Sequence, residues 1–252
     1  MAGGKSKYIE ALQLLGQIEA ELKLVIAGNH DLSLDPDWWQ ANLDDDDDPF
    51  EPDQMKKLMQ SQAENGVQYL EEGTHIFKLK NGTEFSVYAS PYTPEFNGYA
   101  FGYPHEEDRF NNRAAANPIP ENVDIIMSHG PPRFPHDENC EPYTLDMNES
   151  SKHLGCLHLF RAIQRVRPLL HCFGHIHEGY GAQFASWEQG NALALHQVES
   201  ELENGLRRLI FTEVMSRGTL LINAALKVHG SQQNNHPWIL TLPLRHQTGM
   251  NI

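Results

Sequence analysis

The spacing of apolar residues in the first part of the chain predicts helices and strands in alternation. In residues 5–22 the apolar side chains recur at steps of three and four, which is the spacing of one face of an amphipathic helix. Residues 23–27 follow as a short apolar strand, and residues 52–62 are predicted to form a second helix. A helix that leads into a buried strand is typical of a layered α/β domain. Asp35-Pro36 is expected to end the segment that follows Gly28.

A hairpin and an aromatic loop are predicted next. Residues 75–79 and 84–89 are expected to pair because Asn81-Gly82, between them, is a strong turn dipeptide. Residues 90–104 are dense in aromatic residues, glycine and proline, and this composition predicts an irregular loop. The aromatic side chains of this loop either pack against one another or form a wall that faces a substrate.

The second half of the chain continues the alternation less regularly. Residues 123–127 and 169–173 are predicted strands, and residues 152–166 form a predicted helix between them that ends before Pro168. Residues 192–215 are predicted to form one long polar helix. Residues 219–225 and 238–242 are expected to be the last strands.

Composition narrows the classes of protein that fit. The chain of 252 residues, 40% hydrophobic and 21% charged, suits a single globular domain. A formal charge of −15 disfavours binding to a nucleic acid polymer. The three cysteines contain no CxxC pair, which disfavours a disulfide framework and fits a reducing compartment. Without a long apolar run or an apolar leader, we expect a cytoplasmic protein that binds no membrane.

Three apolar segments each end in glycine and histidine. The sequences at their ends are Gly28-Asn29-His30-Asp31, Ser128-His129-Gly130 and Gly174-His175-Ile176-His177. Imidazole and amide oxygen are neutral ligands that suit Zn, Fe, Mn or Ni. Two histidines two positions apart would face opposite sides of a strand, so they share a centre only on a turn, and each glycine is expected to supply the backbone freedom for its turn. The pattern predicts a common metal site at the strand ends.

These motifs resemble the last three motifs of the calcineurin-like metallophosphoesterases. Residues 90–98, 119–132 and 177–181 are similar to the branch that contains fetal-brain metallophosphoesterase-domain proteins, which is associated with class III cyclic-nucleotide phosphodiesterases. The resemblance covers residues 5–181 and resumes near residues 221–224, leaving an insertion at about residues 183–217 of a single domain over residues 1–252. It implies an α/β fold, a β-sandwich flanked by helices, with two metal ions at strand ends.

The resemblance also implies roles for individual residues. In the family pattern, His30 would protonate the leaving alkoxide or stabilise its charge, and Asp31 would orient the imidazole of His30. The implied ligands are Asn29, His129 and His175 for the second metal ion and His177 for the first. The implied activity is hydrolysis of a phosphoric ester, with a small phosphate ester, such as a cyclic nucleotide, as the substrate.

The sequence departs from the family pattern at its start. The family opens with Asp-x-His and then Gly-Asp, and neither combination occurs anywhere in this sequence. We therefore expect a chain that starts inside its domain, without the first strands. The four implied ligands are all neutral, and two divalent ions at short separation repel each other strongly. The expectation is that at most one metal ion binds tightly and that this chain is inactive or weakly active.

Two other interpretations stay open at this point. A non-catalytic binding or scaffold protein derived from the same fold is favoured by the absence of the two carboxylate motifs. A histidine-rich metal store is the weaker interpretation, because the 14 histidines are scattered along the chain. The sequence predicts no particular protein partner.

Overall fold

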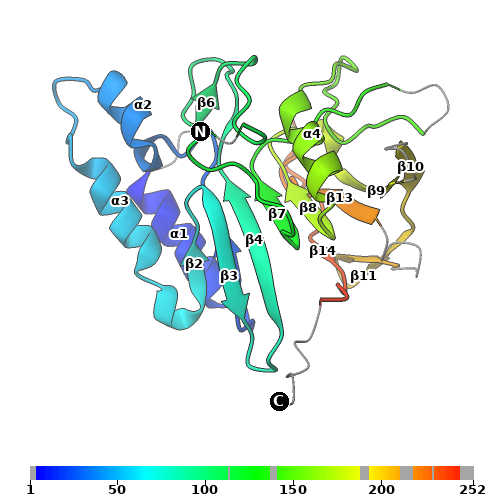
Figure 1. Ribbon diagram of the computed structural model, residues 1–252. Coiled ribbons are helices and arrows are strands. Elements are labelled where there is room, and N and C mark those ends of the chain that lie inside the picture. The colour runs from blue at the N-terminus through cyan, green and yellow to red at the C-terminus, as the bar shows by residue number, and fades with distance from the viewer. Residues whose placement is uncertain are drawn as a thin grey trace, which may run out of the picture.

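The computed structural model describes residues 4–112, 114–136, 141–187, 193–210, 218–228 and 230–244. Its centre is a seven-stranded mixed sheet with the order β10-β9-β13-β8-β7-β4-β3 (Figure 1). The strands of this sheet are β3 (Gly73–Lys78), β4 (Glu84–Ser90), β7 (Ile125–Ser128), β8 (Leu170–Phe173), β9 (Gly181–Trp187), β10 (Leu193–Gln197) and β13 (Gly218–Asn223).

The middle of this sheet is parallel. Strands β4, β7, β8 and β13 run in one direction, and β3, β9 and β10 pair antiparallel at the two sides. The carboxyl ends of parallel strands meet at one edge of a sheet, which is where open α/β sheets place their sites. The loops that carry His129 and His175 leave β7 and β8 at this edge.

A second, smaller sheet is the parallel pair of β1 (Lys23–Val25) and β2 (Val67–Tyr69), and it packs on one face of the main sheet. Leu24 and Ile26 pack against Val87 and Ala89 of β4, so the two sheets form a sandwich. Helices α1 (Lys5–Gly16) and α3 (Glu51–Gln60) cover the outer side of the small sheet, as the blue and cyan ribbons of Figure 1 show.

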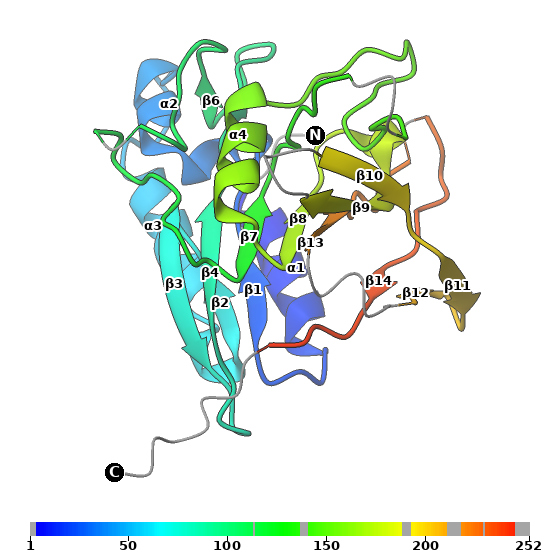
Figure 2. The ribbon, with the colours of Figure 1, turned by 45° about the vertical axis from the view of Figure 1, so that its right-hand side comes forward.

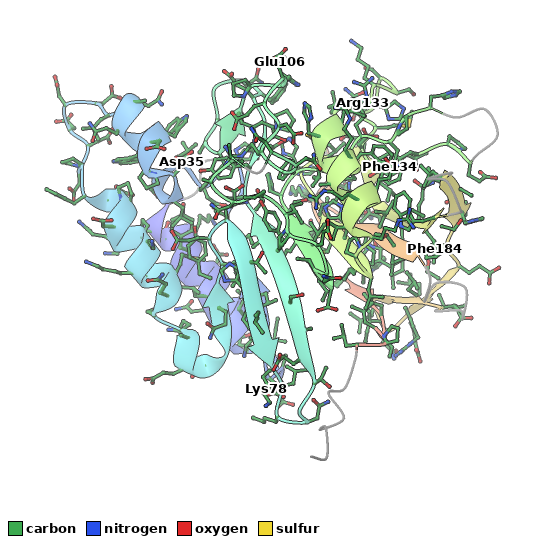
Figure 3. All side chains as sticks on the ribbon, viewed as in Figure 1. Asp35, Lys78, Glu106, Arg133, Phe134 and Phe184 are labelled. Atoms are coloured by element: carbon green, nitrogen blue, oxygen red, sulfur yellow. The ribbon has the colours of Figure 1, made fainter. Side chains whose placement is uncertain are left out.

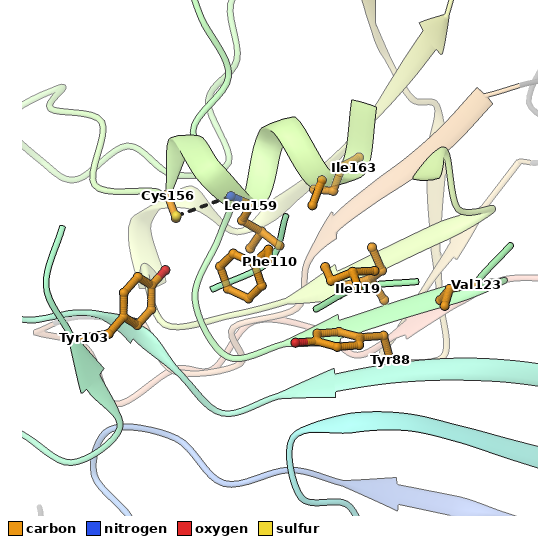
Figure 4. Packing of buried hydrophobic residues seen from close by; sticks show 10 residues of the cluster. Tyr88, Tyr103, Phe110, Ile119, Val123, Cys156, Leu159 and Ile163 are labelled. Atoms are coloured by element: carbon orange, nitrogen blue, oxygen red, sulfur yellow. Dashed lines mark hydrogen bonds between the residues drawn. The ribbon is translucent and has the colours of Figure 1, made fainter. Parts of the chain in front are cut away.

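Helix α4 (Leu157–Val166) covers the opposite face of the main sheet (Figure 2). Its Leu159 and Ile163 pack on Tyr88 of β4 and Ile126 of β7, and Phe110 lies in the same core (Figure 4). The fold is thus a mixed α/β sandwich with helices on both outer faces, which confirms the predicted fold class. Within the part of the chain that the structure describes, no helix has the length and apolarity needed to cross a membrane.

Most predicted elements of the first half are present with shorter bounds. The helix expected over residues 5–22 ends at Gly16, and the strand expected over residues 23–27 is Lys23–Val25. The predicted hairpin is confirmed, and its turn places Gly82 at a φ of 88°. Asp35-Pro36 ends the short 3₁₀ helix η1 (Leu32–Leu34), as predicted, and Asp35 also caps the start of α2 (Pro36–Ala41) by accepting a hydrogen bond from the backbone N–H of Trp38.

The long helix predicted over residues 192–215 is wrong where the structure describes those residues. This part of the chain contains β10, β11 (Ser200–Glu203) and β12 (Leu206–Leu209), and β14 (Trp238–Ile239) pairs with β12. The register pairs Glu203 with Leu206 across Asn204-Gly205, whose φ angles of 50° and 78° are those of a tight hairpin turn. The preference of Asn204-Gly205 for a hairpin turn therefore decided the structure of this segment, although its apolar spacing favours a helix. Residues 192 and 211–217 lie outside the described residues.

The remaining elements are short. They are η1 (Leu32–Leu34), η2 (Ala63–Asn65) and η3 (His177–Gly179), together with the pair β5 (Thr93–Pro94) and β6 (Gly102–Tyr103) inside the aromatic loop. Strand β13 pairs along its whole length with Gly181 to Ser186 of β9, so the main sheet continues into the segment that is expected to be an insertion.

Candidate metal centre

Three of the predicted ligands meet at the ends of β1, β7 and β8. Nε2 of His129 lies 2.8 Å from Oδ1 of Asn29. The ring centroids of His129 and His175 are 4.8 Å apart, with the ring planes at 61°. Asn29 is buried, and both histidines are partly buried. The ring of His129 therefore lies against both the amide oxygen of Asn29 and the ring of His175, which come from distant parts of the sequence.

Two glycines allow the ring of His129 to reach this point. A Cβ at Gly28 would lie 2.6 Å from Cε1 of His129, and one at Gly130 would lie 2.9 Å from Oγ1 of Thr93. Neither glycine has a positive φ among the described residues. The predicted reason for these glycines, freedom to turn, is therefore wrong at both positions: they are required because neighbouring atoms approach too closely for a side chain.

The turn after β8 is made by a histidine. His175 has a φ of 68°, in the left-handed region that side-chain-bearing residues adopt only at a cost. A Cβ at Gly174 would contact only Ala225, at 3.9 Å, so nothing requires glycine there. The sequence correctly predicts a turn between His175 and His177, but the unusual backbone conformation belongs to His175. Strain of this kind is typical of functional sites.

The four imidazoles of the three motifs lie close enough for their charges to interact. Burial is the main cause that lowers the pKa of His129 to about 3, and the charges of His175, His30 and His177 contribute to this shift. Burial lowers the pKa of His175 to about 4, again with contributions from His177 and His30. The two buried rings are therefore neutral at pH 7, which is the form that offers a lone pair to a metal ion.

Asp31 does not orient His30. Its Oδ2 accepts a hydrogen bond from the backbone N–H of Gly28 at 2.8 Å, and its own N–H donates to the carbonyl of Gly28 at 2.9 Å. No hydrogen bond joins Asp31 to the ring of His30, although both residues are described. The predicted contact fails because the carboxylate closes the turn that carries Asn29 and His30. Burial raises the pKa of Asp31.

The ring of His30 contacts Tyr99 instead. The two ring centroids are 4.5 Å apart, and the planes meet at 62°. Tyr99 belongs to the aromatic loop at residues 90–104, for which the sequence left a packed interior and a substrate-facing wall as alternatives. The packed interior is confirmed, because Tyr103 and Phe101 are buried. Tyr99 is half-buried beside His30 and Phe96 is exposed, and a wall that faces a substrate stays a prediction.

Behind the centre, a buried histidine supports the turn of His129. Nε2 of His171 is 2.7 Å from Oγ of Ser128, and that hydroxyl donates to the carbonyl of Gly130 at 2.7 Å. His171 is fully buried, and its pKa is lowered to about 3 by burial alone. This supporting role of His171 was not predicted from the sequence. A histidine in the middle of an apolar strand was the available signal.

An apolar pocket of about 290 Å³ lies beside His129, between the segment that follows β1 and the ends of β7 and β8. Its wall includes Ile26, Met127, Cys172 and Phe173, with His129 and Asp31 on the same wall. The centre therefore borders free space of the size of a small organic group.

The residues present fit one divalent ion. The 2.8 Å between Oδ1 of Asn29 and Nε2 of His129 matches the separation of about 3 Å expected for neighbouring ligands of one ion. Among the described residues no three His, Cys, Asp or Glu side chains converge closely enough to hold a metal, so a set of three ligands here would have to include the amide of Asn29. All three ligands are neutral, and nothing in this set offsets the charge of a second ion.

Sequence comparison identifies the family. Residues 3–179 match the model of the calcineurin-like phosphoesterases. The chain belongs to the calcineurin-like phosphoesterase family. This confirms the resemblance that its three motifs carry, and members of this family are generally metal-dependent.

Curated relatives in this family support the branch as well. The metallophosphoesterase domain-containing protein 1 of Homo sapiens is 36% identical over 172 residues, which cover 66% of this chain and 48% of that protein. UPF0046 protein T07D4.2 of Caenorhabditis elegans is 28% identical over 177 residues, or 67% of this chain and 41% of that protein. The chain thus spans about half the length of the curated relatives it matches.

A further match extends over more of the chain. The probable rhamnogalacturonate lyase C of Emericella nidulans is 30% identical over 236 residues, which are 89% of this chain but 20% of that protein. The similarity therefore reaches beyond the part covered by the family model, into or across the segment at residues 183–217.

Proposed function

We propose that this calcineurin-like phosphoesterase chain binds one divalent metal ion at Asn29, His129 and His175 and hydrolyses a small phosphoric ester there, slowly. The observation that carries the proposal is the convergence of one amide oxygen and two neutral imidazoles at the ends of three strands. Family membership makes phosphoric ester hydrolysis the reaction class that fits these ligands.

Each side chain has a distinct part in the proposal. Asn29, His129 and His175 hold the ion, and His177, which the family pattern assigns to the other metal ion, is not part of this ligand set. When bound, a divalent ion supplies polarisation of the phosphoryl oxygens and offsets their charge. That charge is otherwise repelled by the formal charge of −15 on the protein. The exposed imidazole of His30 donates a proton to the leaving oxygen, and a positioned acid of this kind contributes roughly 10²–10⁴-fold.

The absence of a carboxylate ligand limits both metal content and rate. Asn29, His129, His175 and His177 carry no negative charge, and the sequence contains neither Asp-x-His nor Gly-Asp. We therefore propose that one ion binds tightly and that turnover is weak. The substrate class is a small phosphodiester, and a cyclic nucleotide is one candidate.

Metal analysis tests the centre. The chain is loaded with Mn²⁺, passed through gel filtration and assayed for retained metal beside His129→Ala and His196→Ala. His196 is an exposed histidine on β10 and serves as the control. We expect one retained equivalent of Mn²⁺ in the unaltered chain and in His196→Ala, and almost no retained Mn²⁺ in His129→Ala. Two retained equivalents would contradict the single-ion proposal, and none in the unaltered chain would contradict the centre itself.

Hydrolysis of bis(4-nitrophenyl) phosphate with added Mn²⁺ tests the reaction. We expect slow, metal-dependent turnover by the chain and by His196→Ala, and a fall of about 10²-fold or more in His30→Ala on esters whose leaving group must be protonated. A metal-loaded chain without turnover above the metal-free background would favour the second candidate. That candidate is a non-catalytic binding protein, which the wholly neutral ligand set also fits.

A further inference from the structure

Among the described side chains, the ring of Tyr99 contacts the ring of His30. No hydrogen bond within the described residues holds that ring, and Asp31, the neighbour expected to do so, bonds to the backbone of Gly28. An exposed imidazole without a partner samples several rotamers, which would spread its nitrogen atoms over several positions. The edge contact with Tyr99, at 4.5 Å between centroids, restricts this freedom.

The loop that carries Tyr99 is fixed on both sides of it. On one side, the indole Nε1 of Trp38 donates to the carbonyl of Gly98 at 2.6 Å. On the other, the buried carboxylate of Asp35 accepts the N–H of Phe101 at 2.6 Å. Both anchors come from the start of α2. Figure 3 shows Asp35 at the same end of the molecule as Glu106, away from the hairpin tip at Lys78.

The backbone around Tyr99 is held in an unusual conformation. Asn97, Gly98 and Phe101 have φ angles of 52°, 66° and 55°. This region is costly for a bulky residue such as Phe101, so the surroundings must impose it. Phe101 is buried, and its ring meets Tyr92 with centroids 5.4 Å apart. The presentation of Tyr99 is thus enforced by tertiary contacts.

We infer that Tyr99 is a positioning residue that holds the imidazole of His30 in the orientation from which it protonates a leaving group. This inference rests on the proposed function. It differs from a substrate wall, because Tyr99 acts here through His30 and needs no contact with the substrate. Phe96, on the same loop, is exposed and has no ring contact with His30 among the described residues.

The reaction gives this role a specific signature. Hydrolysis forms a phosphorus–oxygen bond to the oxygen of water and breaks the bond to the leaving oxygen. The proton of His30 ends on the leaving alcohol or phenol, the attacking water loses one proton to the solvent, and His30 takes a proton back from the solvent. A good leaving group such as 4-nitrophenolate departs without a proton, whereas phenolate depends on one. Loss of positioning therefore slows esters with poor leaving groups selectively.

Kinetics on two esters test the inference. Methyl phenyl phosphate and methyl 4-nitrophenyl phosphate differ only in the leaving group, and kcat and KM are measured for the chain, Tyr99→Leu, Tyr99→Phe and Phe96→Leu. We expect Tyr99→Leu to lower kcat on the phenyl ester about tenfold more than on the nitrophenyl ester, with KM unchanged. Tyr99→Phe, which keeps the ring, and Phe96→Leu should behave like the unaltered chain.

Equal losses on the two esters in Tyr99→Leu, or a Tyr99→Phe variant as impaired as Tyr99→Leu, would overturn the inference while leaving the proposed function intact. A second measurement needs no turnover. In the metal-free chain, NMR should detect nuclear Overhauser effects between the ring protons of His30 and Tyr99. Their absence would overturn the inference even if the chain is active. If the chain hydrolyses neither ester, the proposed function fails, and these ring contacts alone decide whether Tyr99 fixes His30.

Discussion

A single methyl group at position 28 should disable the metal centre. In Gly28→Ala the new Cβ would lie 2.6, 2.7 and 2.9 Å from Cε1, Nδ1 and Nε2 of His129, distances that real Cβ atoms essentially never show. The imidazole cannot yield like the end of a flexible chain, because Asn29 and His175 lie against it. The ring must rotate away and give up its hydrogen bond to Asn29.

The expected size of the effect follows from these contacts. Overpacking a closely packed site costs about 1–3 kcal/mol, and the lost hydrogen bond adds roughly 1 kcal/mol. For a protein of this size such a loss lowers the melting temperature by about 4–16 °C. Misplacement of one of three ligands should weaken metal binding by about 10–100-fold or more, by analogy with disturbed ligand orientation.

The matched control is Gly174→Ala. Gly174 also precedes a predicted ligand, His175, but a Cβ there would meet only Ala225 at 3.9 Å, an ordinary contact. Calorimetric titration with Mn²⁺ and thermal unfolding should therefore show normal affinity and stability for Gly174→Ala and loss of both for Gly28→Ala. Equal metal affinity in the two variants would refute the reasoning that Gly28 is required for the approach of His129.

Two further predictions concern stability. Burial lowers the pKa of His171 to about 3 from 6.5, so its contribution to the stability of the metal-free protein is complete above pH 6.5 and is lost as the pH falls towards 3. Urea unfolding of His171→Phe in this range should show a pH slope smaller by about 1.4 kcal/mol per pH unit; an unchanged slope would contradict the burial of a neutral ring. Asp35→Ala removes the cap of α2 and the acceptor of the Phe101 N–H, and should cost about 2–4 kcal/mol in thermal unfolding. The exposed Asp37→Ala should cost less than about 0.5 kcal/mol, and equal effects would argue against the Asp35 network.

Local signals were sufficient for much of the fold. The apolar spacing of residues 5–22 predicted α1, and Asn81-Gly82 predicted the β3–β4 hairpin. Local signals failed where two of them competed. Residues 193–210 have helix-like apolar spacing, yet the turn at Asn204-Gly205 and pairing with neighbouring strands make them strands. The spacing of apolar residues alone could not distinguish helix from strand here, because these strands also pair with segments from more distant parts of the chain.

The sequence by itself determined the strand-end motifs, their residue types and the family to which they belong. Each of these is a local property, since a strand, a turn and the chemistry of a side chain are specified within a few residues. Only the tertiary structure decided what each residue touches. The carboxylate of Asp31 bonds to Gly28, the ring of His30 meets Tyr99, and the strained φ belongs to His175. Such contacts are set by close packing between segments far apart in the chain, where a few tenths of an ångström determine which atoms meet.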